Sequence, residues 1–457
     1  MSDRSPSPRR DPHKVCFITF GCQMNKLDSE LVAAEFVRRG ATLTSDTDQA
    51  GVIIINTCSV RKHAEDRALS NLGRFKHAKK HCPQLILVLM GCMAQKEGPK
   101  LLRDHPHLDV VCGTRQFLRL PELVERARTE GERIVLTDDG TVAFDRLASV
   151  RPERHRAFLS VMRGCNGFCT YCIVPYVRGR ETCRPPEHIE EEIHCLVDDG
   201  CVEVTLLGQN VDAYRHNDTD LAALLERLDR VPGLKRLRFV TSHPRDISDR
   251  LLHAVADLPT VCEHLHVPAQ SGSDPILKAM HRGYTARRYR QVVDSARTIV
   301  PDVELAGDFI VGFPGETETD FQATLDLLQY CQYNQAFIFK YSPREGTRAA
   351  RMIDDVPQDI KARRNQALLA AQKESAHTHN QSKLGRTLEV MLQGPSKRDP
   401  ARLHGRTRGN DIVVFTPPPA WTGEPGDLVQ VRIDHCTPLT LFGTLTPTSR
   451  PLKETAG

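Results

Sequence analysis

The chain has 457 residues, 40% of them hydrophobic, so it is long enough for two or three compact domains that each bury a core without disulfides. Its formal net charge of +4 is too small to indicate a nucleic-acid-binding protein by itself, so charge must be considered segment by segment. The 15 cysteines exclude little, but thiols in a large chain without an export signal are more often metal ligands or nucleophiles than disulfide partners.

Residues 1–13 are the first segment, which we expect to be a disordered tail. The segment is rich in Ser, Pro and Arg and has no apolar run of the kind found in a signal peptide or a membrane span. We therefore expect a cytoplasmic protein with no membrane partner.

Residues 14–145 alternate short apolar runs with helical stretches and form the first predicted domain. The predicted strands are Val15 to Phe20, Val52 to Ile55, Leu85 to Met90 and Val110 to Cys112. This alternation is typical of an open parallel sheet with crossover helices. A charged, Pro-containing linker at 146–156 follows it.

Three cysteines of this domain, Cys22, Cys58 and Cys92, each fall two or three residues beyond a predicted strand. The loops at the carboxyl ends of parallel strands meet in one crevice, so we expect these thiols to converge. Three thiolates would suit an iron-sulfur cluster that keeps one iron open. The alternative is three buried cysteines that pack as small apolar side chains. Gly21 and Gly91 directly precede two of them, which favours the metal site.

Residues 155–380 repeat the strand-helix pattern and form the second predicted domain. The predicted strands are Phe158 to Met162, Val202 to Leu207, Leu237 to Val240, His264 to Val267, Glu304 to Val311 and Ala336 to Lys340. Six strand-helix units are too few for a closed eight-stranded barrel and predict an open, partial (β/α)6 barrel. The protein is therefore expected to be of the α/β class.

A second group of cysteines, Cys165, Cys169 and Cys172, lies in the run RGCNGFCTYC after the first of these strands. Three soft ligands suit three irons of a 4Fe-4S cluster and leave the fourth iron open. The alternative, structural zinc, normally needs four ligands, and no fourth Cys or His follows at zinc-finger spacing. Arg178 and Arg180 come next, and each could bind a carboxylate or a phosphate, although surface salt bridges are the commoner role.

Polar loops follow the later strands of this domain at their predicted carboxyl ends. They are GQN at 208–210, TSHP at 241–244, PAQSGS at 268–273 and GFPGE at 312–316. Glycines and small hydroxyl side chains let backbone amides approach a nucleotide-like cofactor. Turn chemistry alone could explain any single loop, but their recurrence on one edge favours a binding site.

Residues 381–447 contain short alternating strands punctuated by glycines, which predicts a small all-β barrel, and 448–457 is a second predicted tail. This barrel and the helical stretch before it carry many basic residues that would neutralise RNA phosphates. They are Lys361, Arg363, Arg364, Lys373, Lys383, Arg386, Lys397, Arg398, Arg402, Arg406 and Arg408. The alternative is a solvated helix face.

The run RGCNGFCTYC, placed after the first strand of a six-unit α/β domain, resembles the radical S-adenosylmethionine superfamily. In that superfamily the open iron of the 4Fe-4S cluster binds S-adenosyl-L-methionine, and one electron cleaves the sulfonium to a 5′-deoxyadenosyl radical. The resemblance implies that Tyr171 lies near the adenine and that the polar loops hold this cofactor and the target base. The residues expected to make these contacts are Gln209, Asn210, Ser242, Gln270 and Ser271.

The motifs GCQMN, NTCSVR and GCMAQ around Cys22, Cys58 and Cys92 resemble the three signatures of the methylthiotransferase family. This resemblance implies a second, auxiliary 4Fe-4S cluster on these cysteines and no ligand at Cys112. It also implies two S-adenosylmethionine per turnover, one that methylates a sulfur on the auxiliary cluster and one that makes the radical. The C-terminal segment resembles the small TRAM-like RNA-binding barrel of this family.

Finer motifs resemble the methylthiotransferases that act on N6-dimethylallyladenosine in tRNA: NTCSVR with Arg61, GCMAQ with Gln95, LLGQNVDAY and FKYSPREGTRAA. They imply methylthiolation of C2 of that nucleoside at position 37, with the anticodon stem-loop as partner. We also expect a reducing electron donor such as flavodoxin or ferredoxin, and a monomer. Two departures from the family pattern, Ala269 and Cys183, affect detail only.

Three alternatives to this substrate remain. One is an enzyme that acts on threonylcarbamoyladenosine in tRNA, for which GCKVN is typical at the first cysteine. Another acts on a ribosomal protein, for which NTCGF is typical at the second cysteine. The third is a non-enzymatic iron-sulfur or RNA-binding scaffold, which would need only one cluster and no cofactor loops.

Overall fold

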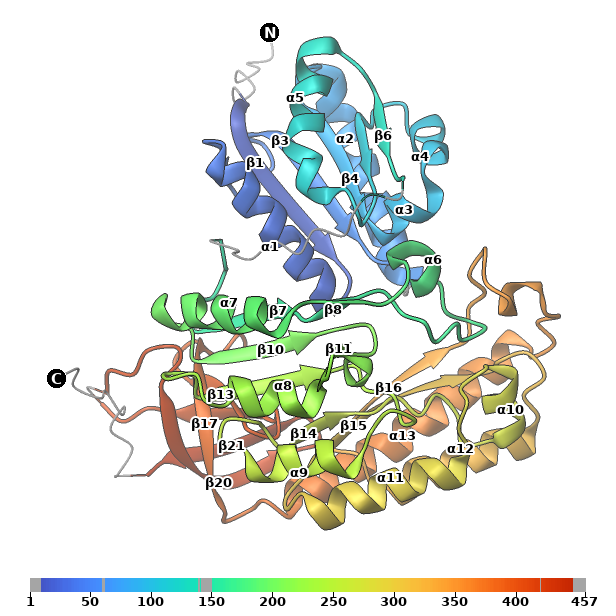
Figure 1. Ribbon diagram of the computed structural model, residues 1–457, viewed down its shortest axis with the longest axis vertical. Coiled ribbons are helices and arrows are strands. Elements are labelled where there is room, and N and C mark those ends of the chain that lie inside the picture. Colours follow the sequence, from blue (N-terminus) through green and yellow to red (C-terminus); the bar gives the residue numbers. More distant parts are fainter. Residues whose placement is uncertain (1–9, 60–61, 139, 141–149, 420, 447–457) are drawn as a thin grey trace, which may run out of the picture.

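The computed structural model describes residues 10–59, 62–138, 140, 150–419 and 421–446. Arg61, the first nine residues and the predicted tail at 448–457 lie outside these ranges. Along the chain follow an N-terminal sheet, a central partial barrel and a closed C-terminal β barrel (Figure 1). In the described ranges, no helix combines the length and apolar character needed to cross a membrane.

The N-terminal part is a parallel sheet of six strands in the order β2-β1-β3-β4-β5-β6. The strands are β1 (Asp11–Phe20), β2 (Thr42–Leu43), β3 (Ala50–Thr57), β4 (Ile86–Gly91), β5 (Val110–Cys112) and β6 (Ile134–Leu136). Every residue of β3 is buried, which is the continuous apolar pattern of a central parallel strand. The predicted open parallel sheet is confirmed, with β2 and β6 as short additional strands.

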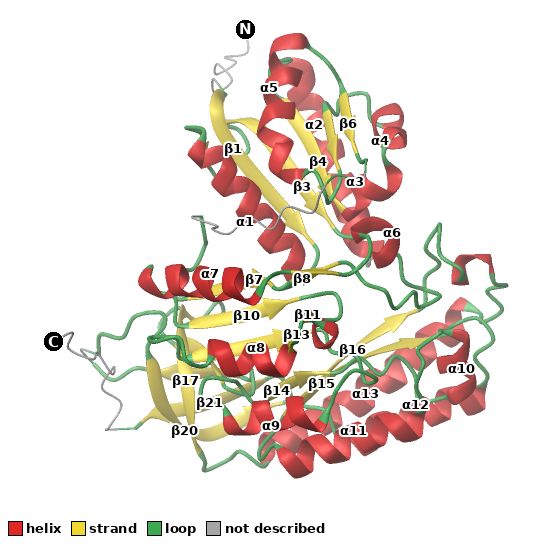
Figure 2. Cartoon of the chain, viewed as in Figure 1, coloured by secondary structure: helices red, strands yellow, loops and turns green. Residues whose placement is uncertain are grey.

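Helices cover both faces of this sheet (Figure 2). They are α1 (Gln23–Arg38), α2 (Lys62–His81), α3 (Cys92–Glu97), α4 (Pro99–Asp104), the short η1 (Phe117–Arg119) and α5 (Leu120–Glu130). Leu31 on α1 and Leu123 on α5 belong to one apolar core with Val52 of β3. Leu72 on α2 packs with Ile53 in the core on the other face. Because side chains alternate along a strand, α2 covers the face opposite α1 and α5.

The central part is built from two three-stranded parallel sheets in the orders β13-β10-β7 and β14-β15-β16. A parallel bridge between Leu237 and Val261 connects them. The strands are β7 (Arg156–Ser160), β10 (Glu203–Leu207), β13 (Arg236–Val240), β14 (His264–His266), β15 (Glu304–Val311) and β16 (Gln335–Lys340). All six predicted strands are present, each within two residues of its predicted bounds, and the partial barrel is confirmed.

The remaining elements of this part connect or cover the strands. The helices are α6 (Val174–Arg178), α7 (Pro186–Asp198), η2 (Val211–Ala213), α8 (Leu221–Leu228), α9 (Asp249–Asp257), α10 (Asp274–Ala279), α11 (Ala286–Ile299), α12 (Glu318–Cys331), η3 (Ala349–Arg351) and α13 (Gln358–Gln381). Two short antiparallel ribbons pair β8 (Met162–Arg163) with β9 (Thr182–Cys183) and β11 (Arg215–His216) with β12 (Thr219–Asp220). The sequence pattern did not predict these ribbons.

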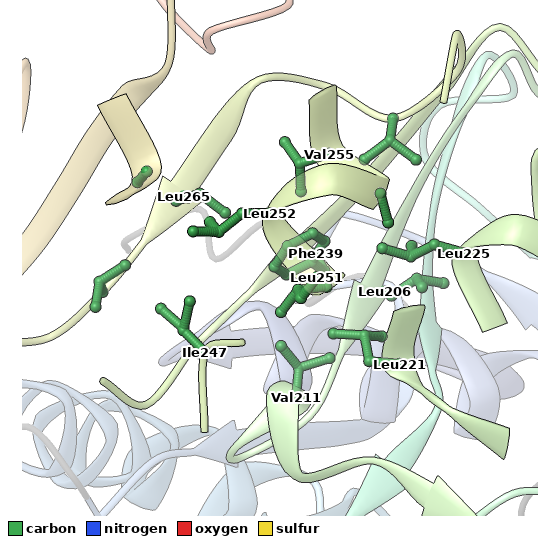
Figure 3. Close-up of a cluster of buried hydrophobic side chains, with 14 of the residues drawn as sticks. Leu206, Val211, Leu221, Leu225, Phe239, Ile247, Leu251, Leu252, Val255 and Leu265 are labelled. Atoms are coloured by element: carbon green, nitrogen blue, oxygen red, sulfur yellow. The ribbon is translucent and has the colours of Figure 1, made fainter. Parts of the chain in front are cut away.

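The core of the central barrel lies between its strands and these helices. Phe239 on β13 and Leu206 on β10 pack with Leu221 and Leu225 on α8 (Figure 3). The leucines recur at the spacing of one helix face, and Asp220 caps the helix by accepting a hydrogen bond from a backbone amide of its first turn. This packing fixes the barrel wall, so the loops at the strand ends stand on a rigid base.

The C-terminal part is a closed five-stranded barrel in the order β17-β18-β19-β21-β20. The strands are β17 (Thr387–Pro395), β18 (Leu403–Thr407), β19 (Ile412–Thr416), β20 (Leu428–Thr437) and β21 (Thr440–Leu445). Along β20, Val429, Val431 and Ile433 point inward while Gln430 and Arg432 are exposed, as period-two burial requires. The predicted all-β barrel is confirmed.

This C-terminal barrel packs against the amino ends of the central strands (Figure 1). Arg236, the first residue of β13, is fully buried and donates to the carbonyl of Arg406 at 2.8 Å. Arg238 donates to the carbonyl of Thr407 at 2.7 Å. The polar loops follow the carboxyl ends of the strands, so the C-terminal barrel and the loops lie at opposite ends of the central strands.

Candidate functional site

The three N-terminal cysteines lie at the carboxyl ends of neighbouring strands. Cys22 follows β1, Cys58 follows β3 and Cys92 begins α3 directly after β4. Gly21 has a φ of +143°, and a Cβ built there would lie 2.7 Å from the Cβ of Cys58. Only glycine lets these two loops approach so closely. The thiol of Cys58 is hydrogen-bonded to the thiols of both Cys22 and Cys92, so the structure brings the three predicted ligands together.

The environment of these thiols favours the thiolate form at two of them. The hydrogen bond with Cys58 lowers the pKa of Cys22 to about 6 and that of Cys92 to about 7. The positive charge of Arg178 lowers both pKa values further. The pKa of Cys58 is raised well above its usual value by its hydrogen bonds to the other two and by burial. Thiolates are the form in which cysteines bind metal.

Two asparagines hold the loops of Cys22 and Cys58 in place. The side-chain oxygen of Asn25 accepts hydrogen bonds from the backbone amide and the thiol of Cys22, both at 3.3 Å. Its amide donates to Asn56 at 3.1 Å, and Asn56 donates back to the Asn25 carbonyl at 2.8 Å and to Ser29 at 2.9 Å. Sequence reasoning quoted both asparagines inside the motifs GCQMN and NTCSVR but gave them no role. Their position beside the cysteines in both motifs was the sequence signal that could have identified them.

A buried carboxylate joins the N-terminal sheet to the central barrel. Asp28 on α1 accepts hydrogen bonds from Arg163 at 2.9 Å and from Arg178 at 2.8 Å. Burial alone would raise the pKa of Asp28, but the charges of Arg178 and Arg163 outweigh it and hold the pKa below its usual value. Thr114 also donates to the carbonyl of Val177 across the same junction. Arg178 therefore binds a carboxylate of its own chain.

The second group of cysteines lies on the loop between the short strands β8 and β9. The backbone amide of Gly167 donates to the thiol of Cys165 at 3.3 Å. A Cβ built at Gly167 would lie 3.3 Å from the sulfur of Cys165 and 3.9 Å from that of Cys169. Both thiols therefore face the same point of the loop. Burial raises the pKa of Cys165, and it raises the pKa of Cys172 to about 12.

Helix α6 lies next to cysteines of both groups. Cys92 packs with Ile173 and Val177 in one small apolar cluster, and Cys172 directly precedes Ile173. The carboxyl edge of the N-terminal sheet and the cysteine loop of the central barrel therefore meet at this helix. Each group offers three thiols in a partly or fully buried setting, and this donor set fits an iron-sulfur cluster with one open iron.

Arg282 links the cysteine loop to the loop after β14. Its guanidinium donates to the thiol of Cys169 at 3.4 Å, to the carbonyl of Pro268 at 3.0 Å and to the hydroxyl of Tyr284 at 3.2 Å. Tyr171 packs beside Met280 and other residues of a separate small core, and burial raises its pKa well above the usual value. Sequence reasoning did not identify Arg282, because its contact with Cys169 spans 113 residues.

The predicted cofactor-binding residues take several positions. Gln209 accepts a hydrogen bond from the Gly164 amide, which places it against the cysteine loop. Asn210 donates to Asp246 at 2.8 Å, and its buried side-chain oxygen has no partner among the described residues. Gln270 has a φ of +67°, a strained conformation for a non-glycine residue beside β15. The hydroxyl of Ser271 faces Thr324 on α12 at 3.1 Å, so its observed contact is with a helix of the barrel wall.

Ser242 belongs to a buried polar group that sequence reasoning only partly identified. It donates to Asp212 at 2.9 Å, and Asp212 also accepts from the backbone amide of His243 at 3.0 Å. Burial raises the pKa of Asp212 to about 7, and burial together with the nearby Arg282 lowers the pKa of His243 to about 3. His243, which its low pKa keeps neutral, and Asp212 thus lie at the carboxyl edge of the barrel, in the loops TSHP and GQNVDA.

Most of the C-terminal basic residues make ion pairs within the chain, and their role in binding RNA stays a prediction. Lys361 pairs with Asp354 at 2.5 Å, Arg364 with Glu316 at 2.7 Å and Arg408 with Glu263 at 2.7 Å. Arg363, Lys383, Arg386 and Arg402 also contact carboxylates, and Arg406 donates to Asn410. Lys373, Lys397 and Arg398 remain exposed, with no ion pair to another described residue. The acids that neutralise the cluster are distant in sequence.

One group of these ion pairs has ligand-type atoms at metal-binding distances. Single atoms of Glu304, His379 and Asp411 lie within 4.8 Å of one another. However, the ammonium of Lys383 lies 2.5 Å from Glu304 and 2.7 Å from Asp411. Because Lys383 already supplies the positive charge that these carboxylates need, the group is a buried ion-pair network.

Three family models match consecutive parts of the chain. Residues 14–113 match the model described as uncharacterized protein family UPF0004, residues 159–328 match the radical SAM superfamily, and residues 381–446 match the TRAM domain. The chain is also similar to solved structures of the radical S-adenosylmethionine methyltransferase TsrM from Kitasatospora setae. For one of them the TM-score is 0.54 at 13% identity over 74% of each chain, a likeness that concerns the fold alone.

Curated relatives are similar over nearly the whole length. The tRNA-2-methylthio-N(6)-dimethylallyladenosine synthase of Desulfitobacterium hafniense is 43% identical over 94% of this chain and 97% of its own. The protein of the same name from Moorella thermoacetica is also 43% identical, with the same coverage. The one from Burkholderia thailandensis is 41% identical over 94% of this chain and 97% of its own.

Proposed function

Because the chain belongs to the family of tRNA-2-methylthio-N(6)-dimethylallyladenosine synthases, we propose that it attaches a methylthio group to C2 of N6-dimethylallyladenosine at position 37 of tRNA. The chain is a radical SAM enzyme by its central domain, and such a domain implies a 4Fe-4S cluster and S-adenosyl-L-methionine. The observation that supports the proposal best is the meeting of two three-cysteine groups at α6.

In this proposal, the cysteines of the central barrel would hold the cluster that binds S-adenosylmethionine. They are Cys165, Cys169 and Cys172. The C2–H bond of adenine is not acidic enough for removal by a side-chain base, so bound cluster and cofactor would supply a hydrogen-abstracting radical. Arg282 keeps the loop in place and donates a hydrogen bond to Cys169. Tyr171, Gln209, Asn210, Ser242, Gln270 and Ser271 stay our candidates for contacts with cofactor and base.

The N-terminal cysteines, Cys22, Cys58 and Cys92, would hold an auxiliary 4Fe-4S cluster and the sulfur that is transferred. Its thiols are supported by Asn25 and Asn56 and lie next to the positive charge of Arg178. One S-adenosylmethionine would methylate that sulfur and a second would make the radical. The geometry supports this division, because Cys92 packs against the same helix that follows Cys172.

The proposed partners follow from the same assignment. The anticodon stem-loop of tRNA would present the base, and the TRAM domain is the first candidate for holding it. A reductant such as flavodoxin or ferredoxin would deliver the electron. We further propose that the enzyme acts as a monomer in the cytoplasm.

The test is nucleoside mass spectrometry after incubation of reconstituted enzyme with S-adenosylmethionine, a reductant and tRNA that carries N6-dimethylallyladenosine. We expect 2-methylthio product with the wild type and none with Cys165→Ala. Product only on threonylcarbamoyladenosine or on a ribosomal protein would contradict the substrate. A protein that binds RNA but never cleaves S-adenosylmethionine would be a scaffold.

A further inference from the structure

Helix α2 has one buried face and one exposed, basic face. Ala68, Leu72 and Phe75 pack on the N-terminal sheet. The exposed surface of the helix carries four cations, which we call the α2 basic face: two seven residues apart lie along one side of it, and two four residues apart lie along the other side. They are Arg67, Arg74, Lys76 and Lys80. Two acids, Glu65 and Asp66, lie in the same helix.

The two acids of α2 do not neutralise this face. Glu65 is buried and pairs with Arg344 of the central part at 3.5 Å. Asp66 pairs with Lys62 at 3.1 Å, in the first turns of the helix. Among the residues that the structure describes, no carboxylate forms an ion pair with any cation of the α2 basic face. Arg67 lies over the ring of Phe20, and Arg74 contacts only the side chain of Asn71.

The α2 basic face differs from the C-terminal basic residues in how far carboxylates of the described residues neutralise its charge. There, Lys361, Lys383 and Arg408 are held by carboxylates and contribute to the fold. On α2 the cations are exposed and their charge is uncompensated, so a polyanion could displace their counterions with a gain in free energy. The exposed cations of α2 are therefore available to a polyanion, whereas Lys361, Lys383 and Arg408 are already paired.

The position of α2 relates this charge to the candidate site. The helix begins four residues after Cys58. Glu65 in its first turn pairs with Arg344, which lies in the loop after the carboxyl end of β16. The amino end of α2 thus lies where the carboxyl edges of the two α/β parts meet. From there its 20 residues extend about 30 Å at about 1.5 Å per residue.

We propose that the α2 basic face binds the sugar-phosphate backbone of the tRNA substrate. This inference rests on the proposed function, because it assumes that an RNA base enters at the cysteine groups. A base held there brings its neighbouring phosphates to the same edge, and the backbone must then continue outward along the protein. Exposed cations along both sides of a helix that starts at this edge provide the complementary charge. Such contacts position the RNA and carry no base specificity.

The experiment compares two charge-matched double variants of the full, reconstituted enzyme. Arg74→Ala/Lys76→Ala removes two cations of the α2 basic face, and alanine preserves the helix. The control, Arg126→Ala/Arg128→Ala, removes two cations from α5 on the opposite face of the same sheet, where both pair with glutamates. The affinity for a fluorescent anticodon stem-loop is measured by anisotropy over a series of salt concentrations.

We expect the α2 variant to bind the stem-loop roughly 5- to 30-fold more weakly at moderate salt, with a log–log salt slope smaller by about 1.4–1.8. The control should stay within about twofold of the wild type. Cleavage of S-adenosylmethionine without RNA should be the same in all three proteins, which shows that the variants are folded and loaded.

Equal affinity and slope in the two double variants would overturn the proposal for α2. Unchanged RNA affinity with slower reduction by an acidic flavodoxin would also overturn it and would assign the face to a protein partner. If the wild type itself neither bound nor modified tRNA, the proposed function would fail, and this inference would fail with it.

Discussion

Arg178 donates a hydrogen bond to Asp28 at 2.8 Å, and both side chains are buried where the central barrel meets the N-terminal sheet. Its nitrogen Nη1 has no hydrogen-bond partner among the described residues. The hydrogen bond with Cys58 is the largest cause of the lowered pKa of Cys22, and the charge of Arg178 lowers this pKa further. The same charge lowers the pKa of Cys92. A residue of the central part therefore stabilises the thiolates of the N-terminal part.

Replacing this arginine should loosen the junction. We expect Arg178→Met to destabilise the protein by an amount at or below the ~3–5 kcal/mol that breaking a buried ion pair costs, because Asp28 keeps Arg163. Arg180→Met is the matched control, since Arg180 lies two residues away and is exposed. Anaerobic thermal unfolding followed by circular dichroism gives the comparison. Equal midpoints for the two variants would show that the pair does not stabilise the junction.

The iron content should divide between the two cysteine groups. We expect about eight irons in the reconstituted wild type and about half of them after Cys165, Cys169 and Cys172 are all replaced by Ala, because each three-thiolate group would hold one 4Fe-4S cluster. Iron and sulfide analysis together with electron paramagnetic resonance measures this. A full iron load in the triple variant, or zinc in the wild type, would contradict two clusters.

The two groups should also separate by activity. Cys58→Ala is expected to abolish methylthio transfer while 5′-deoxyadenosine is still released, because only the first of these needs the N-terminal group. Circular dichroism must first show an intact fold, since Cys58 is buried. Liquid chromatography of both products after incubation with tRNA provides the readout. Normal methylthiolation by the folded variant would make Cys58 a packing residue.

Stability should depend on pH through Glu30 on α1. Burial raises the pKa of Glu30 to about 7, although Arg151 and Lys26 oppose the shift. The unfolded chain releases this proton near pH 4.3, so the raised pKa makes stability fall as pH rises from about 4 to about 7.

The variant Glu30→Gln removes this dependence. It should be more stable than the wild type by about 2 kcal/mol at pH 8, and the gain should shrink as the pH falls below about 7. Anaerobic urea unfolding at pH 6, 7 and 8 tests the trend. A constant difference between the two proteins across this range would mean that Glu30 does not titrate there.

Among the basic residues of the C-terminal barrel and the helix before it, only the unpaired cations should contribute to RNA affinity. We expect Lys397→Ala/Arg398→Ala to weaken binding of the anticodon stem-loop several-fold and to lower the salt slope by about 1.4–1.8. Arg363→Ala/Arg386→Ala is the control, because these two exposed arginines pair with Glu318 and Asp302. Anisotropy titrations measure both. The same loss of affinity in both variants would mean that ion pairing does not decide which cations bind RNA.

The sequence predicted the strands well because buried parallel strands carry continuous apolar runs. The bounds of β15, Glu304–Val311, coincide with the prediction, and β3 is buried throughout. The convergence of Cys22 and Cys58 was also predictable, because loops at the carboxyl ends of parallel strands meet. Their role as metal ligands stays a prediction.

Pairings between distant charges could not be predicted from one sequence. Arg178 and Asp28 are 150 residues apart, and the pattern around neither residue indicates the other. The same reason explains the C-terminal basic cluster, in which Lys383 finds Glu304 and Asp411 only after folding. Composition counts charges, but it does not show which of them are neutralised.

The attachment of the C-terminal barrel through Arg236 and Arg238 has a consequence for how substrate preference can change. These arginines bind mainly backbone carbonyls, those of Glu389, Arg406, Thr407 and Arg408. Every residue type offers the same carbonyl, so these contacts place little demand on side chains of the barrel, whereas Glu389 and Arg408 also dock through their own side chains and must be kept. Outward-facing side chains of the barrel can therefore mutate to suit new RNA partners while the barrel keeps its place on the enzyme.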